Sequence, residues 1–264
     1  MDTTTILALC IALIVPFIGN TLGASFVFLL RHGMGERFQK ALLGFAAGVM
    51  IAASVWSLII PALEASESGP LPAWFPVTAG FLLGMFTLLL IDHFTPHMHV
   101  GSEEPEGMRS GLKKPTMMLF ALAIHNLPEG MAVGAVLAGF LAGDANIALP
   151  AVAALSIGIA IQNIPEGAVV SLPLASNGFS RLKAFGTGTG CGAVEPLGAL
   201  LMLTVTGLAT PALPYILAFA AGAMMYVVTE ELIPETQQGQ HTNIGTIGVA
   251  IGFALMMVLD VALG

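Results

Sequence analysis

Charged residues are scarce in this sequence. Asp, Glu, Lys and Arg make up only 9% of its 264 residues, whereas a soluble domain carries about 25%. The mean hydropathy is +0.90. Apolar runs of roughly 20 residues, the length that a helix needs to cross the hydrocarbon core of a bilayer, recur along the chain. The composition therefore excludes an ordinary soluble domain and predicts an all-α polytopic membrane protein.

Cysteine is scarce, and several catalytic signatures are missing. Cys10 and Cys191 are the only cysteines, and two isolated cysteines exclude a disulfide framework and a cysteine-rich metal site. The glycine-rich stretch 186–190 lacks the Lys-Ser/Thr of a phosphate-binding loop, so we interpret it as a surface for helix packing. The sequence has no His-Glu-x-x-His and no ATP-binding motif. We expect neither an enzyme nor a bound cofactor, and no nucleic-acid partner.

We predict eight transmembrane helices in a single domain, 1–264. They cover residues 5–30, 40–63, 74–94, 116–142, 147–175, 183–208, 211–235 and 243–263. The longest loop, 95–115, is too short to bury a core of its own. We expect the first helix to be retained, because it lacks the basic start and the cleavage site of a signal peptide.

The basic residues predict the orientation of these helices. All 8 Lys and Arg border loops on one side of the predicted bundle: Arg31, Arg37, Lys40, Arg109, Lys113, Lys114, Arg181 and Lys183. Cytoplasmic loops carry an excess of Lys and Arg. Both termini are therefore expected outside, and the protein is expected to span the plasma or bacterial inner membrane.

One polar motif occurs twice inside apolar sequence. Residues 125–130 read His-Asn-Leu-Pro-Glu-Gly, and residues 162–167 read Gln-Asn-Ile-Pro-Glu-Gly. His125 and Glu129 are four residues apart and share a helix face, as do Gln162 and Glu166. Each proline removes a backbone hydrogen bond from its helix.

These motifs supply ligands for a divalent cation. Carboxylate and imidazole suit zinc, iron and manganese, and Asn126 and Asn163 add amide oxygens. The alternative is that the motifs only form hydrogen bonds between kinked helices. Two intramembrane glutamates without a Lys or Arg partner argue against that alternative, because a buried carboxylate needs a cation or a proton.

Two other predicted helices can contribute to this site. Glu195 is a third lone acid, next to a proline in the sixth helix. Met50 lies in the middle of the second helix, with Ser54 and Ser57 on roughly its face. Taken alone, Met50 is more readily explained as packing, and the two serines as bonded to their own helix.

Acidic residues and histidines also gather at the predicted cytoplasmic ends of the third and seventh helices. They are Asp92, His93, Glu230, Glu231 and Glu235, with His97 and His99 in the loop that follows the third helix. Two interpretations remain open: a solvated helix end, or an exit path for cations released to the inside.

The paired motif resembles that of the ZIP (Zrt/Irt-like) metal transporters, in particular their GufA-like bacterial branch. Residues 46–50 (Ala-Ala-Gly-Val-Met), Glu195-Pro196 and the acidic end of the seventh helix match as well. The resemblance covers essentially the whole chain. It implies transport of divalent metal into the cytoplasm, a homodimer in the lipid bilayer and an elevator-like movement of the first, fourth, fifth and sixth helices.

The resemblance also implies two adjacent metal sites halfway across the membrane. One would use Met50, His125, Glu129, Gln162 and Glu166. The other would use Asn126, Glu129, Asn163, Glu166 and Glu195, with both motif glutamates bridging. Many family members have His where this chain has Gln162, which weakens the case for a strict preference for zinc over cadmium, iron or manganese.

Two other function classes compete with transport. An intramembrane metallohydrolase would need an open metal position and a general base, and only one histidine, His125, lies in the interior of a predicted helix. A metal sensor or scaffold would need an output domain, and the sequence has no soluble segment long enough for one. A secondary carrier or slow channel for divalent metal is the leading hypothesis.

Overall fold

The computed structural model describes residues 2–29, 35–67, 69–98, 106–112, 114–176, 178–208, 212–239 and 242–263. Helices fill these ranges, and the described chain contains no strand beyond one isolated bridge between His97 and Glu106. The elements are α1 (Thr3–Leu29), α2 (Glu36–Ala53), η1 (Ser54–Ile59), α3 (Ile60–Ser66), α4 (Trp74–Phe94), α5 (Lys114–Ala142), α6 (Leu149–Ser176), α7 (Arg181–Gly192), α8 (Val194–Leu208), α9 (Leu213–Val227), η3 (Val228–Leu232), α10 (Ile233–Gln237) and α11 (Ile244–Leu263).

Seven helical stretches of the described chain are long and apolar enough to cross a membrane. They are Thr3–Leu29, Glu36–Ser66, Trp74–Phe94, Leu149–Ser176, Arg181–Gly207, Leu213–Gln237 and Ile244–Leu263. Each overlaps one of the predicted spans. The remaining predicted span, 116–142, coincides with α5, which is 29 residues long. α5 is not among these seven stretches.

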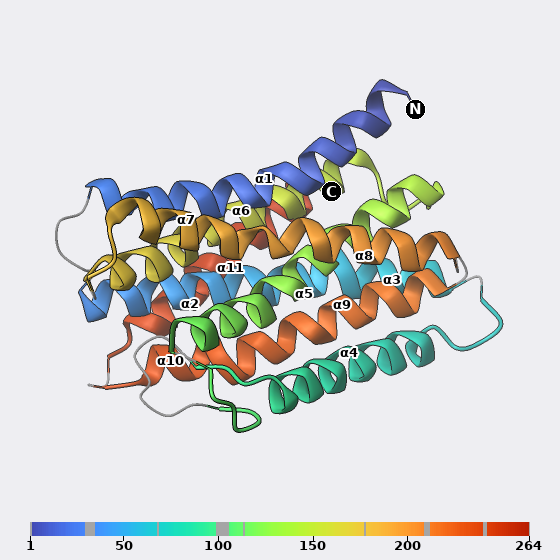
Figure 1. The fold of residues 1–264 in the computed structure, drawn as a ribbon. Coiled ribbons are helices and arrows are strands. Elements are labelled where there is room, and N and C mark those ends of the chain that lie inside the picture. The colour runs from blue at the N-terminus through green and yellow to red at the C-terminus, as the bar shows by residue number, and fades with distance from the viewer. Residues whose placement is uncertain are drawn as a thin grey trace.

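The helices pack in pairs (Figure 1). α1 lies along α6, α2 along α11, α4 along α9 and α5 along α8. Glycines permit the close approach: a Cβ atom at Gly44 or Gly48 would clash with backbone carbonyl oxygens of α11, and one at Gly80 or Gly84 with those of α9. Glycines four residues apart on these helices therefore lie at helix contacts.

Three of the predicted spans are interrupted. The second contains the π-helical segment η1, and the seventh contains the π-helical segment η3. Pro61 follows η1 and Pro234 follows η3, and a proline lacks the N–H that a regular helix needs. The sixth span is divided at Ala193, between α7 and α8. Such interruptions change the direction in which nearby side chains point.

Candidate metal centre

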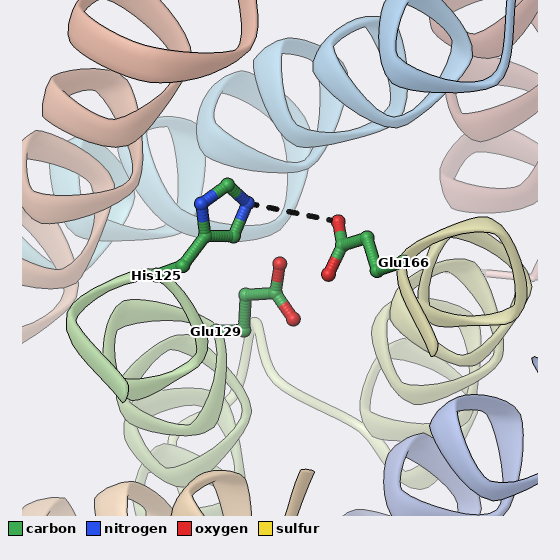
Figure 2. A group of neighbouring side chains, drawn as sticks. All are labelled: His125, Glu129 and Glu166. Atoms are coloured by element: carbon green, nitrogen blue, oxygen red, sulfur yellow. Dashed lines mark ion pairs between the residues drawn. The ribbon is translucent and has the colours of Figure 1, made fainter. Parts of the chain in front are cut away.

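His125, Glu129 and Glu166 form a buried cluster at the middle of α5 and α6. One ligand atom from each of the three side chains lies within 4.8 Å of the others. Figure 2 shows His125 and Glu129 rising from one helix, as their four-residue spacing predicts, and Glu166 facing them from the next. The structure therefore brings the two sequence motifs together at one point inside the bundle.

His125 lies between two carboxylates. Its Nε2 atom is 3.8 Å from Oε1 of Glu166, the ion pair drawn in Figure 2. On the other side of the ring, the Glu231 carboxylate accepts from Nδ1 at 3.0 Å. A carboxylate on one ring nitrogen fixes the tautomer and leaves the other nitrogen available to a metal.

Several ligand atoms in this centre are buried without a hydrogen-bond partner in the described chain. They are Nε2 of His125, Oε2 of Glu129, Oε1 of Gln162 and Oε1 of Glu166. Buried polar groups are normally hydrogen-bonded, and an unpaired one is costly. A cation bound in this cluster would satisfy the atoms of His125, Glu129 and Glu166 together. The donor set of imidazole, carboxylates and an amide oxygen fits zinc and similar divalent ions.

Gln162 contacts the cluster from α6. Its Nε2 atom donates to Oε1 of Glu129 at 2.5 Å, and its side chain is fully buried. In this arrangement the amide N–H group, which carries partial positive charge, faces the Glu129 carboxylate. To serve as a metal ligand, the amide must turn so that Oε1 faces the ion, because only the carbonyl end accepts.

A second polar group surrounds Glu195. Nδ2 of Asn163 donates to Oε2 of Glu195 at 2.8 Å, and Nδ2 of Asn126 lies 3.5 Å from Oε1. All three side chains are buried. Asn126 and Asn163 directly follow His125 and Gln162 in the chain, so the two polar groups are adjacent.

The helix interruptions help to place these acids. Glu231 lies in η3 and is buried, whereas its neighbour Glu230 is exposed. Glu195 lies in the first turn of α8, just after the break at Ala193. A carboxylate is stabilised at this position by the positive end of the helix dipole.

Met50 is fully buried in α2, which packs against α6 and η3. Ser54 donates to the carbonyl oxygen of Met50 at 2.8 Å, the local bond that the packing interpretation predicts. Ser57 instead donates to Oδ1 of Asp260 at 2.6 Å. Asp260 is a buried acid of α11 to which sequence analysis gave no role, although an acid inside the apolar stretch 243–263 was a visible signal.

The residues proposed for an exit path differ in burial and in their contacts. Glu231 contacts His125, Glu235 is partly buried in α10, and Glu230 and His93 are exposed. Asp92 lies 3.1 Å from Nε2 of His97.

His97 is buried in the segment that follows α4. The hydrogen bond with Asp92, aided by the carbonyl of Thr95, raises its pKa to about 9, so His97 carries a positive charge at neutral pH. His99, Arg31 and Lys113 lie outside the described residues.

Sequence analysis missed the contact of Glu231 with His125. The prediction placed Glu231 near the cytoplasmic end of the seventh helix, four positions before the predicted end at 235. The pair Glu230-Glu231 before Pro234 was the available signal. The direction in which the Glu230 and Glu231 side chains point depends on the π-helical segment η3, which could not be predicted from the sequence.

The fold and this centre define a polytopic helical membrane protein with a buried His/Glu/Glu group that fits a metal site. A family model described as "ZIP Zinc transporter" matches residues 112–260, which is more than half of the chain. The chain belongs to the ZIP family of metal transporters, and its relatives are transport proteins rather than enzymes.

Three relatives illustrate the range of the similarity. The zinc transporter ZIPB of Bordetella bronchiseptica is 43% identical over 94% of this chain and 79% of its own length. The human zinc transporter ZIP11 is 35% identical over 92% of this chain and 93% of its own. The zinc transporter GufA of Myxococcus xanthus is 37% identical over 89% and 91%. The resemblance to the GufA-like branch is therefore confirmed.

Proposed function

We propose that this protein moves zinc, or a similar divalent cation, across the membrane into the cytoplasm through the centre at α5 and α6. The metal is the transported substrate, and cadmium, iron and manganese are further candidates. The observation that carries the proposal is the set of buried ligand atoms without a hydrogen bond on His125, Glu129 and Glu166. A purely structural cluster would join these atoms by hydrogen bonds, whereas Nε2 of His125 and Oε1 of Glu166 lie 3.8 Å apart.

The first metal position is assigned to Met50, His125, Glu129, Gln162 and Glu166. Glu231 acts on this position through the imidazole: by accepting from Nδ1 it leaves Nε2, which lies 3.8 Å from Oε1 of Glu166, to bind the ion. Met50 adds a soft thioether from α2, which favours soft metals such as cadmium. Gln162 supplies an amide oxygen where an imidazole would bind zinc more strongly.

The second metal position is assigned to Asn126, Glu129, Asn163, Glu166 and Glu195, with Glu129 and Glu166 shared. Charge supports two ions. Glu129, Glu166, Glu195 and Glu231 are all buried, and when ionised they carry as much negative charge as two divalent cations carry positive charge. A single ion would leave excess buried negative charge, which is costly at membrane depth.

The membrane arrangement belongs to the same proposal. α5 is taken as the eighth span, since a 29-residue helix is about 43 Å long and exceeds the hydrocarbon core. With eight spans in one domain, both termini lie outside and Arg37 and Arg181 lie in the cytoplasm. The membrane is the plasma or inner membrane, and the protein is a homodimer.

The cytoplasmic exit path is assigned to five residues near the inner ends of the third and seventh spans: Asp92, His93, Glu230, Glu231 and Glu235.

Metal flux into sealed proteoliposomes tests the proposal. Purified protein should carry zinc into vesicles that contain a zinc-sensitive dye, and Glu166→Ala should stop the flux. Leu83→Ala, at a lipid-exposed position of α4, is a control that should transport normally. If wild-type protein binds zinc but the vesicles do not fill, the chain is a sensor or scaffold and not a transporter.

A further inference from the structure

Asn20 is a buried polar residue of α1, outside both sequence motifs. Its side chain is 2% exposed, and its Nδ2 atom donates to the carbonyl oxygen of Gly188 in α7 at 2.8 Å. An amide within a membrane helix is costly unless its hydrogen bonds are made. This contact links α1 to the first half of the interrupted sixth span.

The glycine-rich run in α7 fits around this asparagine. A Cβ atom at Gly192 would clash with Nδ2 of Asn20 and lie 2.8 Å from its Cγ atom. A Cβ atom at Gly188 would lie 3.1 Å from Cβ of Ala24, one turn further along α1. Gly186 and Gly190 have no such neighbours, and a Cβ atom there would meet nothing within 4 Å. Only one face of the run is therefore shaped to receive α1.

The same asparagine also touches the helix that carries Glu166. A Cβ atom at Gly167 would lie 2.9 Å from Oδ1 of Asn20 and would clash with its backbone oxygen. Gly167 directly follows Glu166 in the second motif. Asn20 thus fills the junction of three helices, α1, α6 and α7, beside the proposed metal centre.

This junction lies just before Glu195. α7 ends at Gly192, Ala193 forms the break, and Glu195 lies in the first turn of α8. α1 also supports Glu195 by a second route: the carbonyl oxygen of Pro16 accepts from Nδ2 of Asn163 at 3.2 Å, and the same amide donates to Glu195. The direction of Glu195 therefore depends on where α1 holds the end of α7 and the Asn163 side chain.

We propose that Asn20 is a positioning residue for the second metal position: by holding Gly188 and filling the space at Gly192, it sets the place where α7 breaks and so aims Glu195 at Glu166 and Glu129. The inference rests on the proposed function, since it assumes that Glu195 is a ligand of one of two ions. Asn20 itself touches neither ion.

The experiment measures zinc binding to purified, detergent-solubilised protein by equilibrium dialysis, with the melting temperature of each variant as a check on folding. Asn20→Leu keeps the branched shape of the side chain but removes the N–H group that the Gly188 carbonyl accepts. Gly192→Ala disturbs the same contact from the other helix. Gly190→Ala makes the identical change two residues away in open space, and Thr21→Ala removes only a bond within α1.

Asn20→Leu and Gly192→Ala should each keep one zinc ion at the wild-type affinity and weaken the other by at least about tenfold, the loss typical when the support of a ligand is removed. Gly190→Ala and Thr21→Ala should bind as wild type does. Adding Asn20→Leu to Glu195→Gln should cause no further loss, because both act on the same ligand. A role in stability alone would instead weaken both ions equally and lower the melting temperature.

Two results would overturn the inference and are distinguishable from failure of the proposed function. If wild-type protein binds two ions, and folded Asn20→Leu and Gly192→Ala bind both ions unchanged, the role of Asn20 alone is removed. Equal weakening of zinc binding at both positions in these variants would also remove the role of Asn20. Wild-type protein that binds no zinc refutes the proposed function itself, and the inference with it.

Discussion

Nδ1 of His125 lies 3.0 Å from a carboxylate oxygen of Glu231, although the two residues are 106 positions apart in the chain. The contact joins α5 to the π-helical segment of the seventh span. It leaves one ring nitrogen for the metal and assigns the other to a carboxylate. The proposed centre therefore depends on a third helix that neither motif contains.

Replacing Glu231 by Gln should weaken zinc binding by about 10–100-fold, the usual effect of losing the group that supports a metal-bound histidine. The amide keeps the size of the side chain but removes the charge that fixes the His125 tautomer. Zinc affinity of the purified variant is the measurement. Glu230→Gln, the exposed neighbour, serves as the control and should bind nearly as wild type does. Equal effects at the two positions would contradict the role given to Glu231.

Glu166 and Glu195 should differ in how many ions they control. Glu166→Ala removes a shared ligand, so both ions should be lost and transport should nearly stop. Glu195→Gln removes a charge only from the second position, and bound zinc should fall from about two to about one per chain, with some transport remaining. Metal counting on purified protein measures both. A Glu195→Gln chain that still holds two ions tightly, or none, would contradict the two-position assignment.

Met50 should affect soft metals more than hard ones. Met50→Leu keeps the apolar volume and removes the sulfur, so cadmium affinity should fall while manganese affinity changes little. The two affinities are compared by competition dialysis. Met256→Leu is the matched control, because Met256 is equally buried but packs against Gly158 of α6. If Met50→Leu lowers the affinities for cadmium and manganese equally, Met50 contributes packing and not a metal ligand.

The His97 contact should make stability depend on pH. Its folded pKa of about 9 is above the ordinary value of 6.5, so the charged form is favoured in the folded state. The stabilisation is complete below about pH 6.5 and is lost as pH rises through about 9. Thermal unfolding of wild type and His97→Gln should therefore differ most at low pH and converge above pH 9. His93→Gln, at an exposed position, should show no such trend.

The orientation can be tested with single cysteines in a background that lacks Cys10 and Cys191. Cysteines at Arg37 and Arg181 should resist impermeant thiol reagents in intact cells, because the basic loops are expected in the cytoplasm. Ala145→Cys, in the exposed turn between α5 and α6, should be labelled. Labelling at Arg37 or Arg181 from outside would refute the proposed topology.

Much of the fold and part of the centre could be predicted because they depend on local sequence. Apolar length gave the helices, and four-residue spacing placed His125 and Glu129 on one face. The contacts of Glu231 and Asn20 could not be predicted, because they join residues far apart in the chain. The π-helical segments and the break at Ala193 also escaped prediction, since a proline indicates an irregularity but not its form.

The close contact between α1 and α6 constrains how this chain can vary. Gly19 and Gly23 lie against the backbone oxygens of Ala160 and Ile164, where a methyl group would clash with main-chain atoms. Lipid-exposed positions of the same helix, such as Ile14 and Leu22, have no such limit and accept many apolar side chains. A saturation mutagenesis scan of α1 should therefore show intolerant positions at four-residue intervals, separated by positions where apolar replacements are neutral.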